Sequence, residues 1–95
     1  MALPLSHSTP AAGLNFLRWT FASAGDEWPV HDHTFDHTAI VLKGAVELFD
    51  GAGKSVQAVE GGGVILFPAG VRHGLRAVTA GAVVMNILPM QQAHA

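Results

Sequence analysis

Residues 25–44 read GDEWPVHDHTFDHTAIVLKG, and this stretch holds three of the six histidines of the 95-residue chain. His31 and His33 are two residues apart, so on an extended strand their side chains lie on one face. His37 follows after residues 34–36, where a bend would bring it back to the same point from the next strand. Because neutral imidazole suits Zn, Cu, Fe, Ni and Mn, the stretch predicts a metal site held by β-strands.

A second segment, PAGVRH at residues 68–73, places His73 after a tight turn at the head of a predicted strand. The 11 glycines and 5 prolines divide the chain into short pieces that show no helical periodicity. Alternating or β-branched runs predict strands at residues 15–23, 28–30, 37–43, 45–49, 54–60, 64–67, 72–78 and 82–88. Many short strands separated by turns indicate an all-β sandwich or barrel.

The composition indicates one folded domain with a thin core. Hydrophobic residues make up 49% of the chain and charged residues 13%, which excludes a disordered chain. A domain of this length buries only about 60–65% of the surface of its unfolded chain. Since there is no cysteine to form a disulfide, a bound metal or a partner subunit is the expected source of further stability.

Several classes of function are excluded by the same sequence. The net charge of −2 and the lack of a basic stripe argue against nucleic-acid binding. The sequence contains no uninterrupted apolar run of about 18 residues, so no membrane span is predicted. Residues 1–13 contain no Lys or Arg and do not read as a signal peptide, so a cytoplasmic location is expected. No thiol nucleophile exists, and residues 61–63 lack the Lys-Ser/Thr of a phosphate loop.

The spacing of glycines and histidines resembles the two sequence motifs of the cupin family, and together these motifs span over half the chain. The first motif is matched by Gly25, His31, His33, His37 and Gly44, and the second by Gly62, Pro68, Gly70 and His73. The chain departs from the family pattern at His37, where Glu is most common, and at Ala77, where Asn is common.

This resemblance implies a fold and a ligand set. The expected fold is a jelly-roll barrel (a double-stranded β-helix) over residues 14–90, with an N-terminal arm at 1–13 and a mobile tail at 91–95. The implied ligands of a divalent transition metal (Fe, Mn, Ni, Zn or Cu) are His31, His33, His37 and His73. Four neutral imidazoles would leave the full charge of the dication, which favours an anionic or chelating oxygen ligand.

Side chains on the same strand faces as the histidines are candidates to line a substrate pocket. The alternative is that they only pack in the core. The pocket candidates are Phe35, Val41, Leu75, Met85, Asn86 and Trp28, and further aromatic candidates are Trp19, Phe21, Phe49 and Phe67. Asn86 is the one polar residue in residues 82–88, so it either hydrogen-bonds a ligand or faces solvent. Asp32 and Asp36 have the opposite parity and are expected to face solvent or to hydrogen-bond a ligand imidazole.

The favoured function is a metal-dependent dioxygenase or isomerase that acts on a small dicarbonyl, enol or phenolic compound. The alternatives are a small cupin that binds a ligand without catalysis, and a domain in which the metal is only structural; the sequence leaves open whether the chain is an enzyme. The resemblance and the thin core together predict a homodimer, formed through residues 15–23 and the arm before them.

Overall fold

Nine β-strands make up the fold in a computed structural model that describes residues 1–90. They are β1 (Leu5–Ala11), β2 (Leu14–Phe21), β3 (Glu27–His31), β4 (His37–Lys43), β5 (Ala45–Asp50), β6 (Ser55–Glu60), β7 (Val64–Phe67), β8 (His73–Ala77) and β9 (Ala82–Pro89). Eight of them match predicted strands to within two residues. No helix that could cross a membrane occurs among the described residues.

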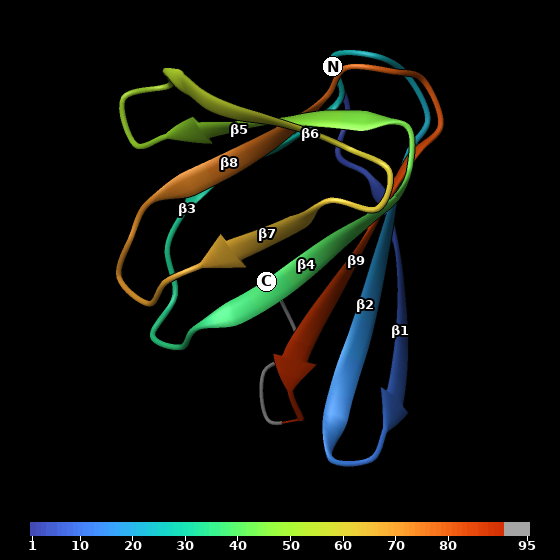
Figure 1. The fold of residues 1–95 in the computed structure, drawn as a ribbon, viewed down its shortest axis with the longest axis vertical. Coiled ribbons are helices and arrows are strands. Elements are labelled where there is room, and N and C mark those ends of the chain that lie inside the picture. The colour runs from blue at the N-terminus through green and yellow to red at the C-terminus, as the bar shows by residue number, and fades with distance from the viewer. Residues whose placement is uncertain (91–95) are drawn as a thin grey trace.

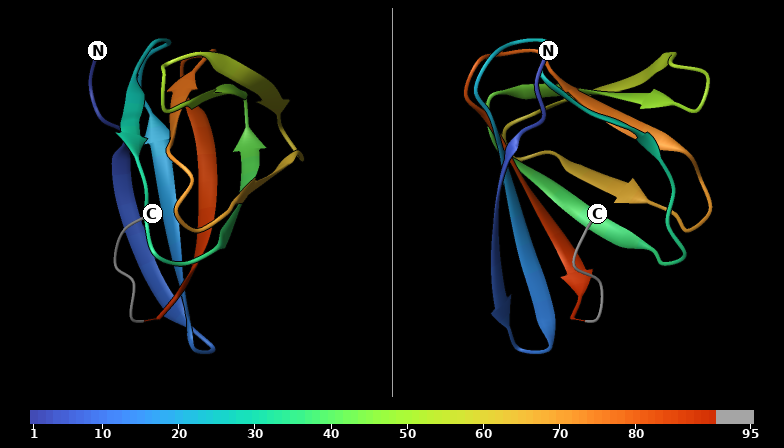
Figure 2. Two further views of the ribbon diagram at one scale, coloured as in Figure 1. Left: turned by 90° about the vertical axis from the view of Figure 1, so that its left-hand side faces the viewer. Right: turned by 180° about the vertical axis from the view of Figure 1, so that it is seen from behind.

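The strands form two antiparallel sheets that face each other. The large sheet has the order β1-β2-β9-β4-β7, and the small sheet has the order β3-β8-β5-β6. Figures 1 and 2 show the two sheets leaning together along one side, with β1 and β2 extending away from the small sheet. From β2 onward, successive strands change sheet except at the β5–β6 hairpin, and the chain is an all-β jelly roll, as predicted.

The core lies between the inner faces of the two sheets. Alternate residues of β2 and β9 are buried, which is the period of a strand with one apolar face. Cross-strand register places Leu17, Asn86 and Ala39 side by side in one inner row of the large sheet. The small sheet contributes Val46, Val59 and Leu75 to the same cluster.

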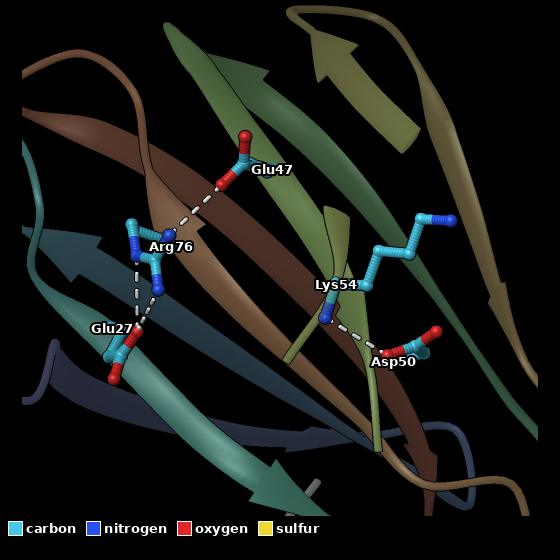
Figure 3. A network of polar contacts seen from close by, with 5 residues as sticks. All are labelled: Glu27, Glu47, Asp50, Lys54 and Arg76. Carbon is cyan, nitrogen blue, oxygen red and sulfur yellow. Dashed lines mark hydrogen bonds and ion pairs between the residues drawn. The ribbon is translucent and has the colours of Figure 1, made fainter. Parts of the chain in front are cut away.

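The outer face of the small sheet is polar. Arg76 lies between two carboxylates and contacts Glu27 at 3.1 Å and Glu47 at 3.2 Å (Figure 3). Its guanidinium also lies 5.0 Å from the ring centre of Phe49. At the end of β5, Asp50 accepts hydrogen bonds from the backbone N–H groups of Ala52 and Lys54, which closes the hairpin loop between β5 and β6.

Residues 1–13 differ from the expected arm, because residues 5–11 form β1 at the edge of the large sheet. Their polar, Pro-containing sequence has no alternation, so the pairing with β2 (Ser8 opposite Leu17) defines the strand. All seven residues of β1 are exposed. The predicted tail at residues 91–95 lies outside the described part of the chain.

Candidate metal centre

Three histidines meet where the two motif segments approach each other. His31 ends β3 and pairs in register with His73, the first residue of β8. His33 lies in the connection between β3 and β4. One ring nitrogen of each residue lies within 4.8 Å of the corresponding atoms of the other two. A single metal ion could therefore be bound by all three rings.

Backbone carbonyls orient these three rings in the same way. Nδ1 hydrogen-bonds to the Pro29 carbonyl in His31 (2.9 Å), to the Phe35 carbonyl in His33 (3.0 Å) and to the Val71 carbonyl in His73 (3.0 Å). Because a carbonyl oxygen only accepts, each Nδ1 carries the proton and donates. The lone pair of the neutral ring is then on Nε2, which is the arrangement that histidine ligands of metals usually show.

The two motif segments are joined by hydrogen bonds as well as by the histidines. The backbone N–H of Gly70 donates to the carbonyl of His33 at 2.8 Å. The N–H of Ala69 donates to Oδ1 of Asp36 at 2.7 Å. Asp36 is exposed and its carboxylate accepts a hydrogen bond from backbone, so it acts on the loop and not on a ligand ring. Gly70 has a φ of 76°, a left-handed conformation that favours glycine.

His37 lies beside this group but outside it. It starts β4, is buried, and stacks on Phe67 with ring centres 4.6 Å apart. Its ring centre is 4.7 Å from that of His33 and 6.3 Å from that of His73. Neither of its ring nitrogens has a hydrogen-bond partner among the described residues. The structure thus groups three of the four predicted ligands, with the fourth adjacent to them.

Burial keeps two of the four rings neutral. It lowers the pKa of His37 from 6.5 to about 4, and repulsion from His33 acts in the same direction. The amide of Asn86 opposes this shift, although no full hydrogen bond joins the two side chains. The pKa of His73 is also lowered to about 4, first by burial and then by repulsion from His31. A metal ion requires the neutral rings that these shifts provide.

The predicted pocket residues divide into three sets. Val41, Leu75 and Asn86 are fully buried, and Asn86 uses its Nδ2 to donate to the carbonyl of Leu17 at 3.2 Å. Trp28 and Phe35 are partly buried against the core.

These two aromatic residues contact the histidines. Trp28 packs edge-on to His31, and Phe35 stacks on His33 with ring centres 4.6 Å apart. Met85 neighbours Asn86 on β9 and so faces the outer side of the large sheet, away from the histidines. Adjacent strand residues point to opposite faces, and Asn86 points into the core, so Met85 points outward.

A pocket of about 340 Å³ adjoins the histidines and is lined by Asp36, His37, Thr38, Leu66, Phe67 and Pro68. Phe67 connects the pocket to the site, because its ring centre is 4.3 Å from that of His73. Four of these residues stand out in the sequence for other reasons, whereas Thr38 and Leu66 carry no functional signal there. They meet because β4 and β7 pair with His37 opposite Phe67, a contact between residues 30 positions apart.

The two facing sheets form a β-sandwich, and the histidine group that could hold a metal ion lies where β3 and β8 meet. The model of the cupin domain matches residues 17–88, which is most of the chain, so this chain belongs to the cupin family. None of the curated proteins compared by sequence matches it.

Solved structures support the same fold. An RmlC-like cupin protein from Desulfovibrio desulfuricans is 28% identical, with a TM-score of 0.76 over 92% of this chain and 83% of that chain. KdgF from Halomonas sp. is 19% identical, with a TM-score of 0.78 over 93% and 79% of the two chains. Oxalate decarboxylase of Bacillus subtilis (W96Y) is 17% identical, with a TM-score of 0.75 over 94% of this chain and 26% of that one.

Proposed function

We propose that this chain binds one divalent transition-metal ion through Nε2 of His31, His33 and His73, with His37 as a fourth ligand. The observation that carries the proposal is the shared orientation of the first three rings, each with Nδ1 bound to a backbone carbonyl. The donor set fits the ion, because three imidazole nitrogens already lie within 4.8 Å of one another.

Support for His37 as the fourth ligand comes from its position and its unused nitrogens. A buried polar atom without a partner is uncommon, and both nitrogens of this buried ring lack one among the described residues. Its ring centre lies 4.7 Å from that of His33, which places it next to the group. The ring is neutral above about pH 4, as a ligand must be.

We further propose that the site acts on a small oxygenated compound, such as a dicarbonyl, an enol or a phenol. A bound divalent metal supplies Lewis acidity toward ligand oxygen atoms, and a redox-active one supplies reaction with dioxygen. The chain's own part is to orient the rings and to exclude water: Phe67 and Phe35 stack on His37 and His33 beside the pocket. The pocket of about 340 Å³ has room for a small molecule.

Capture of a ligand without catalysis is favoured by a separate observation. The two carboxylates nearest the site, Asp32 and Asp36, are both exposed, and Asp36 is hydrogen-bonded to backbone. Asp36 lines the pocket, but its Oδ1 already accepts the backbone N–H of Ala69, and Asp32 is not among the lining residues. Chemistry here would depend on the metal, and a protein that only binds its ligand would need no base.

The test combines metal analysis with an activity measurement. The purified chain should contain close to one equivalent of Fe, Mn, Ni, Cu or Zn, and the His73→Ala variant should contain far less. Oxygen uptake and substrate loss would then be followed with a β-dicarbonyl compound and with a catechol. Turnover that disappears in His73→Ala supports the enzyme. Saturable binding without turnover supports ligand capture, and wild-type protein that takes up no metal contradicts the proposal.

A further inference from the structure

Asn86 is fully buried on β9, the strand that lies between β2 and β4 in the large sheet (Figure 1). It uses only half of its side-chain amide. Its Nδ2 donates to the carbonyl of Leu17 on β2 at 3.2 Å, whereas its Oδ1 has no hydrogen-bond partner within residues 1–90. A buried acceptor without a partner costs free energy, so a donor that pairs with this oxygen is expected in the working protein.

The strand register directs the free oxygen toward His37. Asn86 lies opposite Ala39 of β4, and His37 lies two residues before Ala39 on the same inner face. Diagonal neighbours of this kind can reach each other with their side chains. Because Nδ2 is turned toward β2, Oδ1 is turned toward β4 on the other side of the amide carbon. Burial lowers the pKa of His37 and Asn86 acts against this effect, as an acceptor beside the ring would.

His37 has the complementary need. A neutral imidazole carries one N–H and one lone pair, on different nitrogens, and both nitrogens of this buried ring lack a partner in the described part of the chain. One hydrogen bond to Oδ1 of Asn86 would satisfy the N–H and leave the lone pair. Nε1 of Trp19 is a further buried donor without a partner, but an amide oxygen has two lone pairs, so the indole does not exclude His37.

The other three histidines show what such a contact does. Each has its Nδ1 hydrogen-bonded to a backbone carbonyl two residues away, which leaves Nε2 for a metal ion. For His37, no contact with a backbone carbonyl is found among the described residues. Its ring stacks on Phe67 at an interplanar angle of 17°, which fixes the plane of the ring but not which edge faces the other histidines.

We infer that Asn86 positions His37 for the metal: its Oδ1 accepts the N–H of one ring nitrogen and leaves the lone pair of the other for the ion. The amide thus takes the place that a backbone carbonyl has at the other three rings. This role presupposes the metal site proposed above, with His37 as its fourth ligand. Asn86 is then a positioning residue, which acts on the ion only through the ring of His37.

Pulsed electron paramagnetic resonance of the Cu²⁺-loaded chain tests this role, because it counts the imidazole rings bound to the ion. The wild type should bind through four rings, and Asn86→Leu and His37→Ala should each bind through three. Calorimetric titration should show Cu²⁺ binding about tenfold weaker in each variant. The double variant should bind no more weakly than His37→Ala alone, because both changes remove the same interaction.

Two further variants separate positioning from a general effect on the core. Asn15→Leu is the matched control, since Asn15 is also buried on the inner face of the large sheet but accepts a hydrogen bond from Ser8 and lies on β2, two strands from His37. It should keep four rings and the wild-type affinity. Asn86→Asp retains an acceptor oxygen beside the ring and should also keep four rings.

The outcomes distinguish this role from the metal site itself. Four bound rings in Asn86→Leu, or losses that add in the double variant, would overturn the role of Asn86. Three bound rings in the wild type would overturn it and leave the site of His31, His33 and His73 in place. A wild type that takes up no ion would overturn the proposed site and the role of Asn86 with it.

A measurement on the unaltered chain covers the case in which Asn86→Leu does not fold. In the Zn²⁺-loaded protein, NMR of the ring nitrogens should show His37 with one metal-bound nitrogen and one N–H. The proton of that N–H should exchange slowly with water and lie close to the side-chain amide of Asn86. A His37 ring without metal, or with an N–H that exchanges fast and is remote from Asn86, would contradict the assignment.

Discussion

At the scale of single residues, the orientation of the rings distinguishes this site from a chance group of histidines. Three backbone carbonyls fix the tautomers of His31, His33 and His73. His37 has no such carbonyl, and its neighbour Asn86 is the polar residue that favours its protonated form. The first three rings are thus prepared as ligands, and the fourth is less constrained.

Removal of a ligand should therefore have graded effects. We expect His73→Ala to weaken Co²⁺ or Zn²⁺ binding by roughly 100-fold or more, since loss of even an indirect partner of a ligand costs 10–100-fold. His37→Ala should weaken binding by about tenfold and leave the fold intact, because the other three ligands remain. Calorimetric titration measures both. His7→Ala, at an exposed position of β1, is the control, and equal losses in all three variants would contradict the assignment.

Asn86 offers a second residue-level prediction. Its amide favours the charged ring of His37, so Asn86→Leu should lower the pKa of His37 below its value of about 4. The variant also leaves the carbonyl of Leu17 without its donor. NMR of the histidine ring between pH 3 and 7 in metal-free protein measures the shift. A His37 pKa that stays the same or rises would contradict the role given to Asn86.

At the scale of elements, close packing between β8 and its neighbours positions His73. An added Cβ at Gly74 would lie 2.5 Å from a ring carbon of Phe49 and 3.0 Å from the carbonyl oxygen of Trp28. Since β8 lies between β3 and β5, it cannot move away from both. The residue after His73 therefore has to be glycine for the small sheet to keep its shape.

Gly74→Ala should accordingly destabilise the fold by about 1–3 kcal/mol, as overpacking of a filled site does. Urea unfolding followed by circular dichroism measures the change. The matched control is Gly61→Ala, where the nearest atom to an added Cβ is 3.9 Å away and the change should stay within about 0.5 kcal/mol. A Gly74→Ala variant as stable as the control would show that the strands next to β8 can move to accommodate the added methyl group, which would contradict the prediction.

Much of this element level could be predicted from the sequence. Alternation and turn residues located β2 to β9, and the spacing of His31 and His33 indicated the shared metal site. Strand β1 was missed because its residues are exposed on both sides and so carry no pattern. The outward position of Met85 was missed although the strand had been predicted. Which residues of β9 face inward depends on the direction of Asn86, and the sequence left that direction open.

At the scale of the whole molecule, the buried histidines make stability depend on pH. His37 and His73 have a pKa of about 4 in the folded chain and 6.5 as the reference value for an exposed ring. Between these values the unfolded chain binds more protons than the folded one. The stabilisation is therefore complete above about pH 6.5 and is lost as the pH falls through 4.

The metal-free protein should thus show a melting temperature that is level above pH 7 and falls steadily between pH 6.5 and 4. Differential scanning calorimetry in a chelator measures it, and the double variant His37→Gln with His73→Gln should flatten the curve. Bound metal should keep both rings neutral. The metal should therefore be released only below pH 5, which is a lower pH than expected for a site whose imidazoles have an ordinary pKa. A melting temperature that rises on acidification would contradict the burial of neutral rings.

The central claim is that His31, His33 and His73 bind one ion within the β-fold. The most direct measurement is a crystal structure of the metal-loaded chain, with anomalous scattering recorded at the absorption edges of Mn, Fe, Ni, Cu and Zn. The account predicts a single anomalous peak about 2.0–2.2 Å from Nε2 of all three rings. A structure with no peak there, or with an ion bound through Nδ1 while the carbonyl contacts are broken, would contradict it.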